Sequence, residues 1–293
     1  MKAGFIGLGA MGQHMARNLH RVGLLAGAWN RTTLKATALA HETGCRAFAS
    51  PGELAAACEV IVTCVSADAD LLAVVDAVRP TLMPGSIVID CSTVAADTAR
   101  SASSRLAGIG AEFLDCPVSG GVEGAKNATL AIMCGGDPAA FERATPVLEA
   151  LGKTVMLMGP SGAGQATKAT NQILCAGAIQ VAAEAMAFAQ AEGLPLERVI
   201  EILGKGAGAS WYFIHRAPYM VRGEYPAGFR VRLHDKDLRI CREMAARHGA
   251  TLPVIETTLA DYAKLLAAGH GEEDISTIFR LKAPLFASPA SDG

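Results

Sequence analysis

The sequence has 293 residues, of which 51% are hydrophobic, and a formal net charge of −2 at pH 7. This length accommodates one large domain or two ordinary ones, and the hydrophobic share is enough for a sizeable buried core. Acidic and basic residues are nearly balanced on both sides of Gly162, so the chain lacks the basic field typical of proteins that bind nucleic acid or anionic membranes.

The cysteines and the apolar stretches indicate a cytoplasmic protein. Eight cysteines are scattered without a Cys-x-x-Cys pair, mostly within apolar runs, as expected of reduced core thiols. The N-terminal residues lack the basic-then-apolar layout of a signal peptide. The apolar stretch 174–191 contains Gln180, Glu184 and Gln190, which favours a buried helix over a membrane span.

A glycine-rich turn follows the first predicted strand. Residues 2–7 form a short apolar strand pattern, and the run GLGAMG at 7–12 precedes an amphipathic helix that ends near Arg21. In a strand–turn–helix setting, Gly-x-Gly-x-x-Gly predicts a dinucleotide site, because glycines permit a tight turn, close approach of a pyrophosphate and close helix packing. The helix N-terminus then faces the phosphates. We expect this turn to contact the cofactor through Gly7, Leu8, Gly9, Met11 and Gly12.

The end of the second predicted strand, residues 25–29, bears on the choice of cofactor. An acidic residue about 20 positions after the glycines is typical of NAD sites, where it binds the adenosine ribose. The sequence has Asn30, Arg31 and Thr32 there. Asparagine removes a charge that would repel a 2′-phosphate, and Arg31 can bind that phosphate with its planar fork. This favours NADP(H), with NAD(H) also open; alternatively, Arg31 is a solvated residue at the start of the next helix.

Further strand–helix units follow. Ser50 is a suitable N-cap for a helix over 51–57. Strands over 60–65 and 86–90 place Val65, Ser66 and Thr93 at the carboxyl edge of the sheet, where ligands of such sheets bind. The remaining predicted elements of this half are strands over 112–116, 129–134 and 154–158 and a helix over 138–151.

A second glycine pair follows the strand that ends at Cys116. Ser119, Gly120 and Gly121 can present consecutive backbone N–H groups as a cradle for an anion. An ordinary flexible turn has the same composition. The residues alone leave both interpretations open.

The second half of the chain has helical patterns almost throughout. One Ala-rich helix extends from Gln165 to about Glu192, followed by Gly193 and Pro195. Further helices are predicted over 195–203, 210–221, 234–248, 253–267 and 272–279, and an unstructured tail after Phe286. We therefore expect an α/β Rossmann-type domain over 1–162 and an all-α domain over 163–293, joined by the long helix.

Lys168, at the start of that helix, is the candidate for proton transfer. A lysine three residues before Asn171 places an ammonium and an amide on one helix face. Hydride transfer to a carbonyl leaves negative charge on its oxygen, and the lysine ammonium can protonate that oxygen. A site of this kind requires no metal. His234 and Asp237 are better explained as a helix cap and an ion pair than as metal ligands. The alternative for Lys168 is an ordinary surface lysine.

Four separated motifs resemble those of the β-hydroxyacid dehydrogenase family along essentially the whole chain. They are the glycine turn with Met11, Asp115-x-Pro-Val-Ser-Gly-Gly, Gly162-x-Gly-x-x-x-Lys168, and Lys236-Asp237-Leu238. The sequence is similar to the 3-hydroxyisobutyrate dehydrogenase and tartronate semialdehyde reductase branches of that family. The resemblance implies a Rossmann-type domain, an all-helical domain and a homodimer or homotetramer.

The resemblance also implies roles for individual residues. Lys168 would be the catalytic lysine, Thr93 would lie beside nicotinamide and substrate, and Lys236 near the cofactor. Ser119, Gly120 and Gly121 would bind the substrate carboxylate. The remaining implied contacts are Val65 and Ser66 on the adenosine side, and Asn171, Gln172, Phe229 and Asp237 around the substrate. Family members have either Asn-Asn or Asn-Gln after the lysine, so which amide contacts the substrate is open.

Several substrates and activities fit this resemblance. The expected substrate is a small carboxylate-bearing 3-hydroxy acid or semialdehyde. Residues 29–32 are also similar to NADP(H)-dependent glyoxylate and succinic semialdehyde reductases. An imine reductase of similar fold, and a non-catalytic relative that only binds the nucleotide, are further alternatives.

Overall fold

The computed structural model describes residues 1–286 and divides into two compact units. The first comprises Met1–Lys168, and the second begins at Ala169, so the division falls within a long helix, α8 (Ala163–Ala191). The predicted unstructured tail after Phe286 lies outside the described residues.

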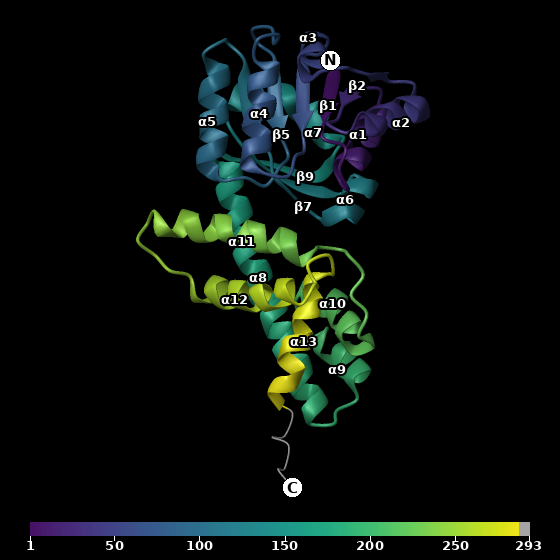
Figure 1. The fold of residues 1–293 in the computed structure, drawn as a ribbon, viewed down its shortest axis with the longest axis vertical. Helices are drawn as coiled ribbons and strands as arrows, with labels where there is room; N and C mark the ends of the chain where they lie inside the picture. Colours follow the sequence, from purple (N-terminus) through teal and green to yellow (C-terminus); the bar gives the residue numbers. More distant parts are fainter. Residues whose placement is uncertain (287–293) are drawn as a thin grey trace. The chain divides into compact units, whose positions relative to one another are not determined.

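The first unit is built on one mainly parallel sheet (Figure 1). Its strands are β1 (Ala3–Ile6), β2 (Leu25–Trp29), β3 (Arg46–Ala47), β4 (Val60–Thr63), β5 (Ile87–Asp90), β6 (Glu112–Asp115), β7 (Val118–Ser119), β8 (Leu130–Gly135) and β9 (Gly152–Gly159). The order β3-β2-β1-β4-β5-β6 is parallel throughout, and β8 is antiparallel to β6 and β7 but parallel to β9. The strand order reverses between β1 and β4, which is where such sheets bind ligands.

Alternating apolar side chains explain why helices cover both faces of this sheet. Phe5 and Val62 belong to one buried cluster, whereas their neighbours Ile6 and Ile61 belong to another on the opposite face. The covering helices are α1 (Gly12–Arg21), α2 (Thr33–Thr43), α3 (Pro51–Ala56), α4 (Asp68–Val78), α5 (Ala96–Ala107), α6 (Gly121–Asn127) and α7 (Pro138–Glu149). The predicted Rossmann-type fold is confirmed.

The second unit is helical, as predicted. It contains most of α8 together with α9 (Leu196–Leu203), α10 (Trp211–Arg222), α11 (Val231–Ala246), α12 (Pro253–Ala267), η1 (Ile275–Ile278), α13 (Phe279–Lys282) and η2 (Ala283–Phe286). Figure 1 shows α11 and α12 side by side. Small residues such as Ala183 on α8 are fully buried among larger ones such as Tyr262 on α12, because small side chains allow close helix packing.

Two predicted helices of this unit have different limits in the structure. The helix expected over 234–248 begins earlier, at Val231. The helix expected over 272–279 is wrong at both ends, because residues 275–278 form a 3-10 turn and the α-helix continues to Lys282. Asp274 Oδ1 accepts from the N–H of Ser276 and so caps the 3-10 turn. The helical segment therefore begins at Ile275, after the predicted start at residue 272.

The apolar helix α8 is long enough to cross a membrane by length and composition alone. However, 56% of its most apolar window is buried inside the protein, as in the core helix of a soluble protein. The eight cysteines, all within residues 1–286, form no disulfide there, and all except Cys45 and Cys64 are buried. Both features agree with a core role for these residues.

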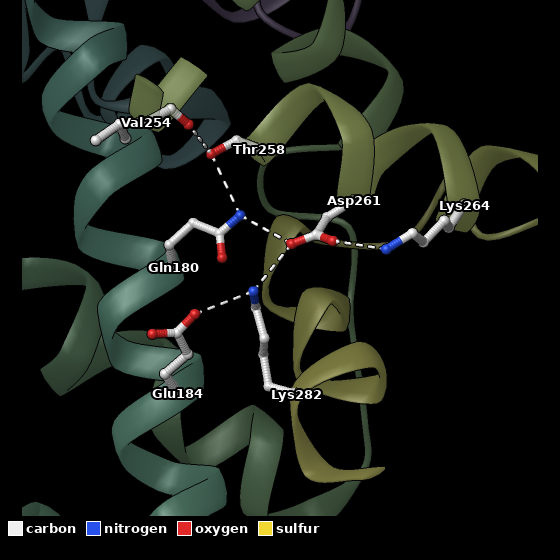
Figure 2. A network of polar contacts seen from close by, with 7 residues as sticks. All are labelled: Gln180, Glu184, Val254, Thr258, Asp261, Lys264 and Lys282. Atoms are coloured by element: carbon white, nitrogen blue, oxygen red, sulfur yellow. Dashed lines mark hydrogen bonds and ion pairs between the residues drawn. The ribbon is translucent and has the colours of Figure 1, made fainter. Parts of the chain in front are cut away.

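A buried polar network joins three elements of the helical unit (Figure 2). Lys282 is 6% exposed, and its ammonium lies 2.9 Å from Asp261 Oδ2 and 3.1 Å from Glu184 Oε1. Gln180 Nε2 donates to Asp261 at 3.1 Å. Burial opposes ionisation of Asp261, but the hydrogen bonds from Lys282 and Gln180 outweigh it and lower the pKa of this carboxyl. The network therefore fastens α13 and α12 to α8.

Candidate active site

The turn between β1 and α1 has the geometry that a bound pyrophosphate requires. Gly7 has a φ of +98°, and a Cβ there would lie 2.2 Å from the carbonyl oxygen of Cys64. A Cβ on Gly12 would lie 2.0 Å from the carbonyl oxygen of Gly7, so only glycine lets α1 close on the turn. A Cβ on Gly9 would meet nothing within 4 Å, so the space beside this backbone is open. These are the three glycine roles of a dinucleotide-binding turn, so the residues fit the cofactor.

Asn30 connects this turn to the end of β2. Its Oδ1 accepts a hydrogen bond from the backbone N–H of Leu8 at 2.8 Å, and its Nδ2 donates to the carbonyl oxygen of Thr32 at 3.1 Å. Leu8 is buried, and Met11 is half-buried immediately before α1. Asn30 therefore shapes the turn as well as removing a negative charge from this position.

A cleft of about 320 Å³ opens at the carboxyl ends of β1, β2 and β4. The predicted cofactor residues that line it are Gly7, Gly9, Asn30, Arg31, Thr32, Val65 and Ser66. The Arg31 side chain is 85% exposed, and its Nη1 lies 3.2 Å from Asp70 Oδ1. The structure thus brings together residues predicted from three separate stretches of sequence.

Sequence reasoning missed two charged residues of this cleft, Lys35 and Asp70. Lys35 lies in the first turn of α2, four residues after Arg31, and a second cation so close to Arg31 in the sequence could have indicated it. Asp70 lies in the first turn of α4, far along the sequence, and has no local signal that relates it to Arg31.

The segments that contain Val65 and Thr93 are joined by buried hydrogen bonds. Ser92 Oγ accepts from the N–H of Val65 at 2.8 Å and donates to Asp90 Oδ1 at 2.6 Å. Thr63 Oγ1 also donates to Asp90 Oδ1, at 2.7 Å. Burial raises the pKa of Asp90 to about 6, although the hydrogen bonds from Ser92 and Thr63 oppose this rise. Two of the predicted cofactor-side loops are therefore held as one structure.

The helix that carries Lys168 is capped by a carboxylate from another part of the chain. Asp115 Oδ1 accepts from the N–H of Gly162 at 2.7 Å, and its Oδ2 accepts from the N–H of Gln165 at 3.0 Å. Burial raises the pKa of Asp115, while these backbone N–H groups act to lower it. Lys168 follows in this helix and is only 7% exposed, so it is not an ordinary surface lysine.

The predicted anion cradle lies between β7 and α6. Ser119 ends β7 and is half-buried, whereas Gly120 and Gly121 are exposed. Their φ angles are +128° and +62°, in the region that favours glycine. A Cβ on Gly121 would meet nothing within 4 Å, so backbone conformation rather than space requires glycine there.

In the helical unit, four predicted substrate and cofactor residues form one chain of polar contacts. Asn171 Nδ2 donates to Gln172 Oε1 at 2.9 Å, and Gln172 Nε2 donates to Asp237 Oδ2 at 2.6 Å. The Lys236 ammonium lies 3.2 Å from Asp237 Oδ1. Gln172 is 1% exposed and Asp237 is 5% exposed, whereas Asn171 is half-buried. The Gln172 amide is thus engaged inside the protein.

Phe229 and His234 pack beside this chain. Their rings are 5.0 Å apart, and His234 Nδ1 lies 2.9 Å from the Tyr262 hydroxyl. His234 is inside α11 rather than at its start, so the predicted cap role is wrong; the earlier start of the helix at Val231 explains the difference. Among residues 1–286, no group of three or more His, Cys, Asp and Glu side chains could hold a metal ion.

Two family models match the chain, and together they cover most of it. Residues 2–159 match the family model described as the NAD binding domain of 6-phosphogluconate dehydrogenase. Residues 162–282 match the one described as the NAD-binding domain of NADP-dependent 3-hydroxyisobutyrate dehydrogenase. The chain belongs to the β-hydroxyacid dehydrogenase family. The dehydrogenase is therefore an oxidoreductase that uses a nicotinamide dinucleotide.

Individual relatives of this dehydrogenase cover about 95% of its length. It is 33% identical over 292 residues to the NAD-dependent L-serine dehydrogenase of Pseudomonas aeruginosa, covering 96% of this chain and 97% of that one. It is 30% identical over 281 residues to glyoxylate/succinic semialdehyde reductase 1 of Arabidopsis thaliana, covering 95% and 97%. The solved structure of Mycobacterium tuberculosis 3-hydroxyisobutyrate dehydrogenase with L-serine has a TM-score of 0.89 and 31% identity, covering 96% and 98%.

Proposed function

We propose that this dehydrogenase transfers a hydride between NADP(H) and a small carboxylate-bearing 3-hydroxy acid or the matching semialdehyde. The bound nicotinamide supplies or accepts the hydride. The observation that carries the proposal is a buried lysine, Lys168, on a helix whose N-terminus is capped by Asp115. A buried ammonium at a site of carbonyl reduction is placed to transfer a proton.

Lys168 acts as the general acid and base. When the carbonyl carbon is reduced, negative charge develops on the oxygen, and Lys168 Nζ donates a proton to it. In the opposite direction the neutral amine accepts the proton of the substrate hydroxyl. Because Lys168 is 7% exposed, little water competes for this proton.

The substrate is held by its carboxylate and by an amide. Ser119, Gly120 and Gly121 bind the carboxylate, and Thr93 lies beside the reacting carbon. Asn171 is the amide that contacts the substrate, because Asn171 is half-buried, whereas Gln172 is 1% exposed and its amide donates to the buried Asp237. Gln172 and Asp237, with Lys236 on the other carboxylate oxygen, hold the Asn171 amide in place. Phe229 packs against the ring of His234.

The preferred cofactor is NADP(H), with NAD(H) as the weaker alternative. Arg31 and Lys35 both line the cleft at the end of β2, and Asn30 stands where NAD sites have an acid. Two cations that line the same cleft can bind a 2′-phosphate together. The backbone of Gly9 approaches the pyrophosphate, and Val65 and Ser66 lie along the adenosine side.

The test of this function is a panel of four aldehydes with purified enzyme. Tartronate semialdehyde, methylmalonate semialdehyde, glyoxylate and succinic semialdehyde are reduced with NADPH and then with NADH, and kcat/KM is compared. The proposal predicts turnover of at least one, with NADPH preferred. The relative named glyoxylate/succinic semialdehyde reductase supports the second pair as the alternative substrates. Turnover of cyclic imines, with none of the aldehydes, would identify an imine reductase. No turnover of any of these compounds would indicate a relative that binds the nucleotide without catalysis.

We further propose that the enzyme is a cytoplasmic homodimer or homotetramer. Helix α8 exposes Leu174, Val181 and Phe188 by 70%, 66% and 52%. Their spacing of seven residues places them along one stripe of the helix, which a second copy would cover. Light scattering on the purified protein should give the mass of a dimer or tetramer, and a monomer at micromolar concentration would contradict this.

A further inference from the structure

A buried glutamine in the first turn of α8 binds the backbone on both sides of Thr93. Gln165 is 1% exposed. Its Nε2 donates to the carbonyl oxygen of Ser92 at 2.9 Å, and its Oε1 accepts from the N–H of Val94 at 3.2 Å. One amide thus satisfies a buried acceptor and a buried donor that flank a single residue, as a neighbouring strand would.

The turn that carries Gln165 is itself fixed to the sheet. Its backbone N–H donates to Asp115 Oδ2 at 3.0 Å. A Cβ on Gly164 would lie 2.4 Å from the backbone carbonyl oxygens of Asp115 and Met133, so the helix start packs directly on the strand ends. The backbone of Gln165 is therefore fixed. If its side-chain hydrogen bonds are lost, the Thr93 segment moves and the helix start does not.

We propose that Gln165 is a positioning residue that sets Thr93 and Lys168 at the correct separation for the reaction. Lys168 follows Gln165 by three residues in the same helix. The first turns of α8 therefore carry Lys168 themselves and hold the Thr93 segment through the hydrogen bonds of Gln165. Ser92 also binds the N–H of Val65, which extends the connection to a cofactor-side loop. This inference rests on the proposed roles of Lys168 and Thr93.

The effect expected from losing Gln165 follows from the geometry of catalysis. A misplacement of about 1 Å at reacting groups can lower a rate about a hundredfold. Gln165→Met keeps the length of the side chain and its apolar packing but removes both hydrogen bonds. We expect kcat to fall by about tenfold to a hundredfold, while the KM for NADPH changes by less than about twofold.

Two further measurements distinguish positioning from simple stabilisation. In the cofactor-free protein, hydrogen exchange of the Val94 amide should become about tenfold faster in Gln165→Met, because this N–H loses its acceptor. The deuterium isotope effect on kcat, measured with NADPH labelled at the transferred position, should rise as hydride transfer becomes rate-limiting. The control is Thr167→Ala, which removes a hydroxyl that donates to the carbonyl oxygen of Ala163 within the helix. It should leave kcat, the exchange of the Val94 amide and the isotope effect unchanged.

The outcomes separate this inference from the proposed function. If Lys168→Ala is inactive but Gln165→Met has the kcat and isotope effect of the native enzyme, Gln165 has no positioning role and the proposed function stands. If Lys168→Ala retains turnover, the proposed role of Lys168 fails instead, and if the native enzyme turns over none of the four aldehydes, the proposed function fails. Should Gln165→Met not fold, Gln165→Glu keeps the shape and the acceptor for Val94 but turns an oxygen toward the Ser92 carbonyl. A native kcat in that variant would equally overturn the inference.

Discussion

If NADPH is the preferred cofactor, as proposed, replacing Arg31 with alanine should give an enzyme that discriminates little between NADPH and NADH. The Arg31 side chain is 85% exposed and lines the cleft at the carboxyl end of β2. The two cofactors differ only in the 2′-phosphate. Removal of a cation that binds this group should therefore weaken NADPH binding selectively.

The size of the effect follows from the exposure of the side chain. A hydrogen bond to a charged group contributes about 1.5–3 kcal/mol, which corresponds to a change of about tenfold to a hundredfold in the dissociation constant. Because Arg31 is mostly exposed, water screens the pair and we expect the lower end, about tenfold weaker NADPH binding. NADH binding should change by less than about twofold.

Asp70 provides a variant with the opposite expected sign. It holds Arg31 in an ion pair at 3.2 Å, and exposed pairs of this kind contribute about 0.2–1 kcal/mol. Asp70→Asn should release Arg31 and remove a charge that repels phosphate, tightening NADPH binding by up to about fivefold. The gain should disappear when Arg31 is also alanine, since Asp70 acts largely through it.

The assay is a titration of each variant with NADPH and with NADH at one fixed salt concentration, followed by protein fluorescence. Lys35→Ala, tested in parallel, should also weaken NADPH selectively. Equal changes in NADPH and NADH affinity for Arg31→Ala, or none in either, would refute the assignment of this cleft to the 2′-phosphate.

Three other substitutions test the site and the fold. Lys282→Ala should lower the free energy of unfolding by about 3–5 kcal/mol in denaturant titrations, because it leaves Asp261 buried without its closest cation. The control is Lys264→Ala: the Lys264 side chain is 66% exposed, so its loss should lower the free energy of unfolding by less than about 1 kcal/mol. Equal losses in the two variants would argue against the buried pair. Asp90, with its pKa raised to about 6, destabilises the native state increasingly as pH rises from 4 to 7, so Asp90→Asn should gain stability relative to the native protein by up to about 3 kcal/mol over that range. A stability difference that is independent of pH would contradict this. Asn171→Ala should lower kcat/KM about tenfold with an unchanged Tm, and an unaltered kcat/KM would remove it from the substrate site.

The parts of the fold that could be predicted are those with a local physical cause. The turn after β1 was predictable because three glycines with different steric requirements lie within six residues of one another. Helix α12 was predicted with its observed limits, Pro253 and Ala267, because proline fits the first helical turn and an apolar face follows it. The Ser50 cap is likewise confirmed, since its hydroxyl accepts from the N–H of Glu53.

The parts that could not be predicted depend on contacts between distant residues. Lys282 reads as a surface lysine near the end of the chain, yet the structure buries it between two carboxylates of α8 and α12. Gln165 looks like any polar residue of a helix start, and its partners lie 71 and 73 residues earlier. The sequence does not distinguish Gln172 from Asn171, whereas in the structure Asp237, 65 residues away, accepts a hydrogen bond from the Gln172 amide. Their roles follow from tertiary partners that no local pattern specifies.

The proposed role of Lys168 as the proton donor is tested most directly by the turnover of Lys168→Ala at saturating NADPH and aldehyde, with NADPH affinity measured separately. We predict a kcat lower by at least about a hundredfold and a nearly unchanged NADPH dissociation constant, because a general acid acts on the reaction rather than on cofactor binding. Lys153→Ala, which removes an exposed lysine of β9, should behave as the native enzyme. A Lys168→Ala enzyme that keeps its kcat would contradict the mechanism.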